Sequence, residues 1–141
     1  MVELTTVLQD NATLVQRPLV VVFFGGTSGI GHYTLRALAK QSALNNGKGF
    51  RAYIAGRNAD AADTIIKECK GIFPEAEITF IKATDLSLVR DVDAACAEIS
   101  QLEAKHGDDA RIDYLMVSYA GAPYLPREGT PHFSDNLLCT C

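Results

Sequence analysis

The stretch Arg17-Pro-Leu-Val-Val-Val-Phe-Phe-Gly-Gly-Thr-Ser-Gly-Ile-Gly-His32 decides the fold of this 141-residue chain. Its apolar run, Leu19–Phe24, is typical of a strand that is buried on both faces of a parallel sheet. Glycines follow at Gly25, Gly29 and Gly31, and residues 32–42 then favour a helix. Strand, glycine-rich turn and helix in this order predict a loop whose backbone N–H groups, with the helix N-terminus, point at a phosphate.

The remaining sequence alternates between strand and helix patterns up to about residue 118. We expect further strands at Phe50–Ala55, Glu77–Lys82 and Ile112–Ser118, and further helices at about Asp60–Ile72 and Leu88–Lys105. This alternation predicts an α/β fold with a parallel sheet of about four strands, three helices and right-handed crossovers. Residues 1–17 are expected to form a helical or irregular lead-in, residues 18–121 the domain, and the proline-containing residues 122–141 an irregular tail.

The glycine spacing G-x-x-x-G-x-G, with Thr27, Ser28 and Ile30 between the glycines, resembles the T-G-x-x-x-G-[IL]-G signature of the short-chain dehydrogenase/reductase family. One departure is Phe24, which stands where the family usually has Thr. The sequences of residues 25–39 and 56–58 resemble those of short-chain reductases from fungal specialised-metabolite pathways. The resemblance implies a Rossmann-like, doubly wound sheet with strand order 3-2-1-4, and the similarity ends before the family's catalytic half.

A cofactor site follows from placing the family's motifs on this sequence. Arg57, with Asn58 beside it, comes where an NAD site usually has an acid, and a guanidinium suits the 2′-phosphate of NADP, so NADP is expected rather than NAD. Asp85 is either the family's adenine-contacting Asp or an N-cap of the next helix. The predicted site comprises Gly25, Thr27, Ser28, Gly29, Ile30, Gly31, Arg57, Asn58, Asp85, Leu86, Ala120 and Gly121.

The fourth strand ends in a motif that differs from the family's N-N-A-G. Ala120 and Gly121 match, whereas Ser118 and Tyr119 replace the two asparagines, so we expect the structural role of the asparagine side chains to be lost. His32 has two interpretations, as a phosphate-facing residue or as an ordinary surface histidine.

No catalytic residue is predicted. The family's Tyr-x-x-x-Lys pair has no counterpart, because no tyrosine is followed four residues later by lysine and the last lysine is Lys105. Three hypotheses remain: an NADPH-dependent oxidoreductase, in secondary-metabolite biosynthesis, that lacks the catalytic half; a non-catalytic dinucleotide-binding or dimerising module; and an inactive truncated remnant. The substrate is not indicated.

Composition limits the partners further. The net charge of −4 gives no general attraction to nucleic acid or acidic membranes, and the first residues lack a secretory signal, so we expect a cytoplasmic protein. Cys69 and Cys96 fall on apolar faces of predicted helices and are expected to be buried thiols, and no metal site is expected. Because Ile112–Ser118 is apolar and no fifth strand follows, its open edge predicts a homodimer, a partner chain or a tail that folds over it, and a poorly stable truncated product is equally compatible.

Overall fold

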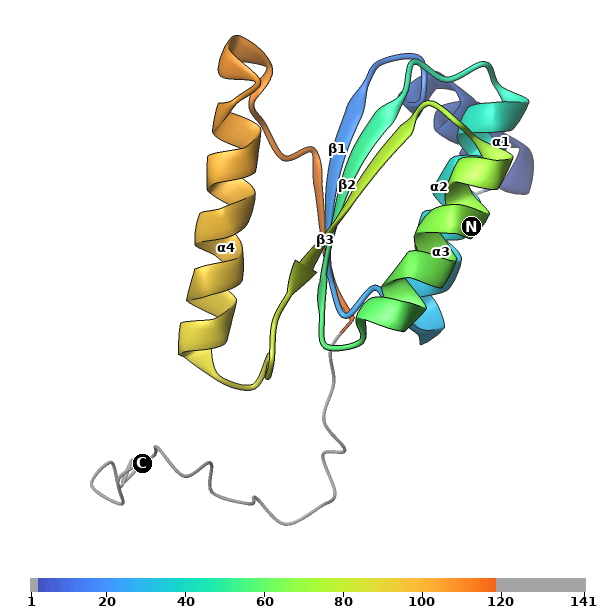
Figure 1. The fold of residues 1–141 in the computed structure, drawn as a ribbon. Helices are drawn as coiled ribbons and strands as arrows, with labels where there is room; N and C mark the ends of the chain where they lie inside the picture. The colour runs from blue at the N-terminus through green and yellow to red at the C-terminus, as the bar shows by residue number, and fades with distance from the viewer. Residues whose placement is uncertain (1–2, 119–141) are drawn as a thin grey trace, which may run out of the picture.

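The computed structural model describes residues 3–118, which form one parallel sheet with helices on both faces (Figure 1). The strands are β1 (Leu19–Phe24), β2 (Phe50–Gly56), β3 (Ala76–Lys82) and β4 (Tyr114–Val117). The helices are α1 (Leu4–Leu14), α2 (Gly29–Leu44), α3 (Ala59–Ile72) and α4 (Val89–Ala104), with a short 3₁₀ turn at Gly107–Asp109. The strand order β3-β2-β1-β4, with every pair parallel, confirms the predicted topology.

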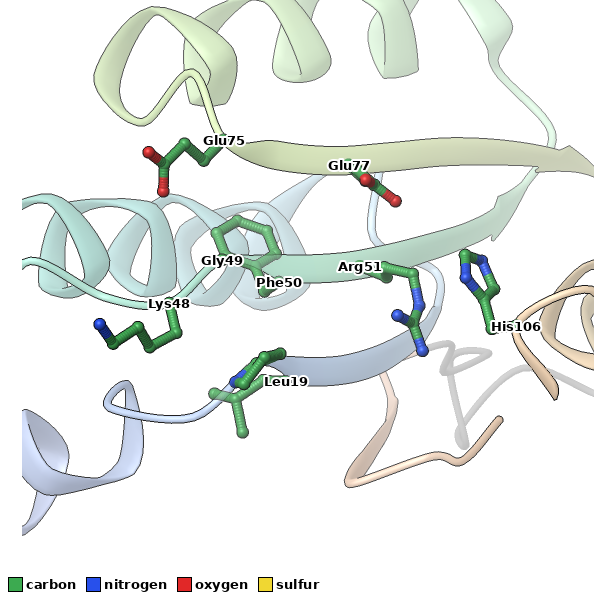
Figure 2. Close-up of a pocket in the computed structure, with 9 residues that line it drawn as sticks. Leu19, Lys48, Gly49, Phe50, Arg51, Glu75, Glu77 and His106 are labelled. Carbon is green, nitrogen blue, oxygen red and sulfur yellow. The ribbon is translucent and has the colours of Figure 1, made fainter. Parts of the chain in front are cut away.

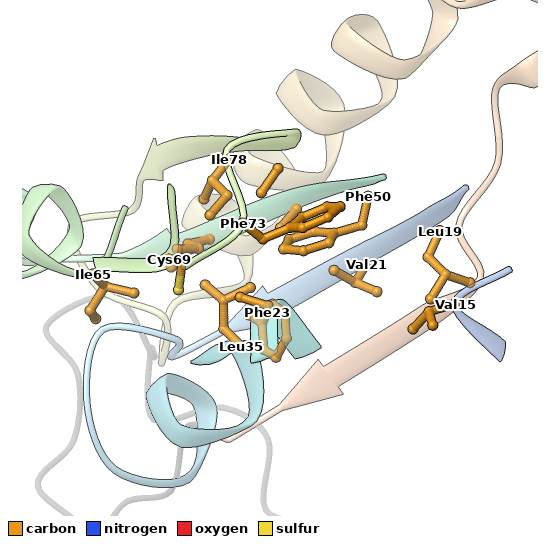
Figure 3. Packing of buried hydrophobic residues seen from close by; sticks show 14 residues of the cluster. Val15, Leu19, Val21, Phe23, Leu35, Phe50, Ile65, Cys69, Phe73 and Ile78 are labelled. Atoms are coloured by element: carbon orange, nitrogen blue, oxygen red, sulfur yellow. The ribbon is translucent and has the colours of Figure 1, made fainter. Parts of the chain in front are cut away.

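β1 lies at the centre of the fold, and all six of its residues are buried. It pairs with β2 from Leu19↔Phe50 onward and with β4 from Val21↔Tyr114 onward. Because side chains alternate along a strand, β1 contributes to a core on each face of the sheet. Val21 and Phe23 pack with residues of α2 and α3 in the larger core (Figure 3). The smaller core beneath α4 contains Val20, Val22, Phe24, Tyr53, Ala55, Ile81, Ala95 and Ile99.

α1 is a fourth helix, in the segment that was expected to be a helical or irregular lead-in. It lies beside α2, and none of its residues is buried (Figure 1). The chain is fixed just after the helix, because Val15 is buried and its carbonyl accepts a 3.0 Å hydrogen bond from the Lys48 N–H. The side chain of Gln16 also donates to the carbonyl of Asn45 at 2.8 Å.

The prediction for Cys96 was wrong. Cys69 is buried as expected, but Cys96 is exposed. α4 packs on the sheet through the stripe Val92, Ala95 and Ile99, at i, i+3 and i+7. Cys96 is one residue beyond that stripe, which turns it about 100° around the helix and into solvent.

A buried carboxylate fastens α4 to the sheet. Glu103 is 5% exposed, accepts two hydrogen bonds from Arg51 at 3.0 and 3.1 Å, and accepts a third from the Tyr53 hydroxyl at 2.6 Å. The Arg111 N–H adds a 3.3 Å contact from the segment before β4. Burial opposes the ionisation of Glu103, but the hydrogen bonds from Arg51 and Tyr53 outweigh it and hold its pKa below the usual range. Burial, with the hydrogen bond to Glu103, raises the pKa of Tyr53 to about 12.

β4 is the least covered strand. A second carboxylate sets its start: Asp113 accepts from the Val20 N–H at 2.9 Å and from the guanidinium groups of Arg17 and Arg111 at 2.9 and 3.0 Å. Beyond it, Leu115 and Val117 are 56% and 66% exposed. Among residues 3–118, no strand pairs with the outer edge of β4.

We expect Glu103→Ala to destabilise the fold by about 3 kcal/mol at pH 7, because Arg51 would be left half-buried without its partner. Because the folded-state pKa of Glu103 lies below the unfolded value of about 4.3, its contribution is present above that pH and is lost as the pH falls through the folded value. Urea unfolding at several pH values measures both effects. Glu98→Ala, on an exposed position of the same helix, should change stability by less than about 0.5 kcal/mol. An equal loss in the two variants would contradict the assigned role of Glu103.

Candidate functional site

The glycine-rich loop leaves the carboxyl end of β1, and two of its glycines adopt conformations that other residues rarely accept. Gly25 has φ 90° and Gly29 has φ 55°. A Cβ on Gly29 would meet nothing within 4 Å, so the backbone there faces open space. A Cβ on Gly31 would lie 2.9 Å from both the Gly25 oxygen and the Gly26 Cα. The sequence therefore needs glycine here for backbone shape at Gly25 and Gly29, and for close packing at Gly31.

α2 begins at Gly29, directly after this loop, and the Ser28 side chain makes no capping hydrogen bond. The first N–H groups of a helix have no partner within the helix, and the aligned peptide dipoles of a helix of 16 residues add partial positive charge there. The loop and the helix N-terminus together favour an anion.

A cleft of about 490 Å³ opens beside the loop, at the carboxyl ends of the strands. It is lined by Gly25, Thr27, Ser28, Gly56, Arg57, Asn58, Ala61, Leu86 and Ser118. Six of these belong to the predicted site; Gly56, Ala61 and Ser118 do not. Gly56 was not predicted as a site residue, although a glycine at the end of an expected strand is a signal for one. A Cβ on Gly56 would lie 3.2 Å from the Thr27 side chain.

The other predicted site residues lie around the cleft or outside the described part of the chain. Gly29, Ile30 and Gly31 form the first turn of α2, with Ile30 71% exposed and Gly31 buried. Asp85 follows β3. Ala120 and Gly121, together with the rest of the tail, lie outside the described residues, so nothing here tests them.

Arg57 is an exposed cation at the rim of the cleft. Within residues 3–118, no carboxylate lies within ion-pair distance of its guanidinium. Asn58, next to it, caps α3 by accepting a 3.0 Å hydrogen bond from the Ala61 N–H. The backbone of Arg57 therefore lies directly before a capped helix, and its exposed guanidinium is available to an anionic ligand.

Asp85 is not the N-cap of α4, which was one of its two predicted roles. The residue before α4 is Leu88, which has no capping side chain. Asp85 instead accepts hydrogen bonds from the N–H and hydroxyl of Ser87, at 2.9 and 2.7 Å. These bonds, and the nearby charges of Arg57 and Arg90, lower the pKa of Asp85.

Two further residues differ from the simplest sequence-based expectations. The His32 side chain contacts α3 rather than the cleft, with Nε2 3.1 Å from the Glu68 carboxylate. Ser118, which replaces an asparagine of the family motif, has a side-chain contact of its own: its hydroxyl donates to the Gly25 carbonyl at 2.9 Å.

A separate cavity of about 230 Å³ lies at the opposite, amino-terminal ends of β1 and β2 (Figure 2). Charges of both signs line it, including Lys48, Glu75 and Glu77, and Arg51 is already bonded to Glu103. Ligands of open parallel α/β sheets bind at the carboxyl ends of the strands, so the cleft beside the glycine loop is the better candidate.

Known proteins match this sequence. A short-chain dehydrogenase/reductase of Stachybotrys chartarum, SAT2, is 45% identical over 105 residues, which are 72% of this chain and 29% of that protein. An oxidoreductase of Emericella nidulans is 43% identical over 139 residues, 98% of this chain and 38% of that protein. The chain belongs to the short-chain dehydrogenase/reductase family. No protein-family model matches it.

The solved structures agree on the fold of this short-chain dehydrogenase/reductase. YwfH, described as an NADPH-dependent reductase involved in bacilysin biosynthesis, superposes with a TM-score of 0.54 at 21% identity, over 75% of this chain and 39% of YwfH. At this identity the likeness concerns the Rossmann-like fold alone. The chain spans only 29% and 38% of the length of the two fungal relatives, so their whole activity does not transfer to it directly.

Residues 3–118 also bear on membrane insertion and metal binding. No helix in this part of the chain is long and apolar enough to cross a membrane. Nor do three His, Cys, Asp or Glu side chains come together there in a way that could hold a metal ion.

We expect Gly31→Ala to destabilise the protein by about 1–3 kcal/mol, because the new methyl group must displace the backbone of Gly25 and Gly26. Gly71→Ala is the matched control: it lies on α3, where a Cβ meets nothing within 4 Å, and should stabilise by about 0.5 kcal/mol. Thermal and urea unfolding measure both. A neutral Gly31→Ala would show that the loop is not packed as described.

Proposed function

We propose that this chain forms the NADP-binding part of a short-chain oxidoreductase. The observation that carries the proposal is the meeting, in one cleft, of an anion-favouring loop and a cation, Arg57, that has no ion-pair partner among residues 3–118. The loop and the α2 N-terminus fit a pyrophosphate, and Arg57 fits the 2′-phosphate that distinguishes NADP from NAD. The absence of an acid at the end of β2 also favours NADP over NAD.

Five of the lining residues have a role under this proposal. The backbone of Gly25, Thr27 and Ser28 would hold the pyrophosphate, and the Arg57 guanidinium would bind the 2′-phosphate. Leu86, on the other side of the cleft, offers an apolar contact to the adenine ring. When bound, a nicotinamide cofactor supplies or accepts a hydride.

The family's proton-donating Tyr-x-x-x-Lys pair has no counterpart in these 141 residues. The five tyrosines are followed, four positions later, by Ala37, Arg57, Ser118, Pro123 and Glu128. None of these is a lysine, and Tyr53, which precedes the one cation, Arg57, has its hydroxyl bonded to Glu103 in the core. NADPH-dependent carbonyl reduction or alcohol oxidation, in secondary-metabolite biosynthesis, is therefore proposed for the assembled enzyme. A cytoplasmic location stays a prediction.

A non-catalytic or dimerising module is the second candidate, and the exposure of β4 is the observation that favours it. Leu115 and Val117 offer apolar side chains beside an edge that is unpaired within the described residues. We propose that a second copy, or another chain, pairs along this edge. An inactive remnant would keep the fold without binding either nucleotide.

We expect the purified chain to bind NADPH at least about tenfold more tightly than NADH, because only NADPH gives Arg57 a phosphate to bind. Arg57→Glu should reverse this order. Lys70→Glu makes the same change of charge at the opposite end of α3 and should leave both affinities unchanged. Calorimetric titration measures the affinities. A folded chain that binds neither nucleotide would contradict the proposal.

We also expect self-association along β4. Sedimentation velocity should show a mass that rises with concentration, and Leu115→Lys should abolish the rise because a charge on an edge strand opposes pairing. Leu44→Lys, at an exposed position at the end of α2, is the control and should behave as the wild type. A wild type that stays monomeric at every concentration would contradict pairing between copies.

A further inference from the structure

We infer that Ser118 is a positioning residue: its hydroxyl clamps the glycine-rich loop in the shape that receives the pyrophosphate. The inference rests on the proposed NADP-binding function, and it concerns a residue that is not among the predicted cofactor contacts. Ser118 follows β4 directly, lines the cleft and is half-buried.

Ser118 joins the loop to β4 through both its backbone and its side chain. Its N–H donates to the Phe24 carbonyl at 2.9 Å, which extends the ladder between β1 and β4 by one bond. Its hydroxyl donates to the Gly25 carbonyl at 2.9 Å and lies 3.4 Å from the Phe24 carbonyl oxygen. The side chain therefore reaches the first peptide of the loop, beyond the last residue of β1.

Gly25 is held from two sides. Its N–H donates to the Ala55 carbonyl at the end of β2, at 2.9 Å, and its carbonyl accepts from Ser118. With φ at 90°, Gly25 occupies a conformation from which a free glycine would readily depart. The two hydrogen bonds fix the two peptide groups that flank Gly25 before a ligand arrives, and such preorganisation favours affinity.

The clamp also requires Gly31. A Cβ on Gly31 would lie 2.9 Å from the Ser118 hydroxyl oxygen, as well as 2.9 Å from the Gly25 oxygen. The hydroxyl and the Gly25 carbonyl therefore fit against the first turn of α2 only because residue 31 has no side chain. This close approach also sets where the N-terminus of α2 lies relative to the loop.

A purely structural hydrogen bond would change stability without distinguishing between ligands, so the test compares two ligands. Both ligands carry the 2′-phosphate that Arg57 would bind, but only NADP⁺ contains the pyrophosphate, which adenosine 2′-phosphate lacks. We expect Ser118→Ala to weaken NADP⁺ binding about fivefold to tenfold, the size of one hydrogen bond, and to leave the affinity for adenosine 2′-phosphate within about twofold. Ser118→Thr keeps the hydroxyl and should restore NADP⁺ binding. Ser100→Ala removes a hydroxyl bonded to the Cys96 carbonyl on α4 and is the control.

Hydrogen exchange provides a readout that needs no ligand. In Ser118→Ala, the amides of residues 25–31 should exchange faster than in the wild type, and those of β2 should not. Unchanged NADP⁺ affinity, an equal loss for both ligands, or unchanged exchange in the loop would each overturn the clamp. A wild type that binds neither ligand would overturn the proposed function instead, and the exchange of the loop then decides whether Ser118 holds it.

Discussion

The burial of β1 on both faces is the constraint on which the rest of the structure depends. A strand of six apolar residues is stable only between two neighbours in the sheet and beneath helices on each side. This requirement places β2 and β4 beside it and α2, α3 and α4 above and below. It also brings the glycine-rich loop, which follows Phe24 without a spacer, to the centre of the carboxyl edge of the sheet. The loop therefore lies between the ends of β2 and β4, where both can bond to it.

The charged groups divide between the two ends of the sheet. Away from the cleft, Glu103 and Asp113 are surrounded by donors, and their bonds to Arg51, Arg17 and Arg111 join α4 and β4 to the central strands. At the cleft, Arg57 has no carboxylate partner among the described residues. Carboxylates thus hold the scaffold together at one end, while the other end carries the Arg57 guanidinium and the N-terminus of α2, with Asp85 close enough to Arg57 to be influenced by its charge.

Much of this could be predicted from local sequence. β1 begins and ends where the apolar run does, and the strand order follows from the alternation and the family resemblance. α2 begins at Gly29, three residues earlier than the helix pattern indicated, because glycine is a poor helix former and Gly29 and Gly31 therefore give no local helix signal. The burial of Cys96 was predicted wrongly because a broad apolar stripe does not fix which residues face the sheet.

Contacts between distant residues could not be predicted in the same way. Ser118 and Gly25 are 93 positions apart, and Arg51 and Glu103 are 52 apart, so their meeting depends on strand register and helix placement that no local pattern records. Amide chemical shifts of ¹⁵N-labelled protein during titration with NADPH test the central claim most directly. The account predicts shifts at Gly25, Gly29, Arg57 and Asn58. Shifts confined to Lys48, Gly49 and His106, around the opposite cavity, would contradict it.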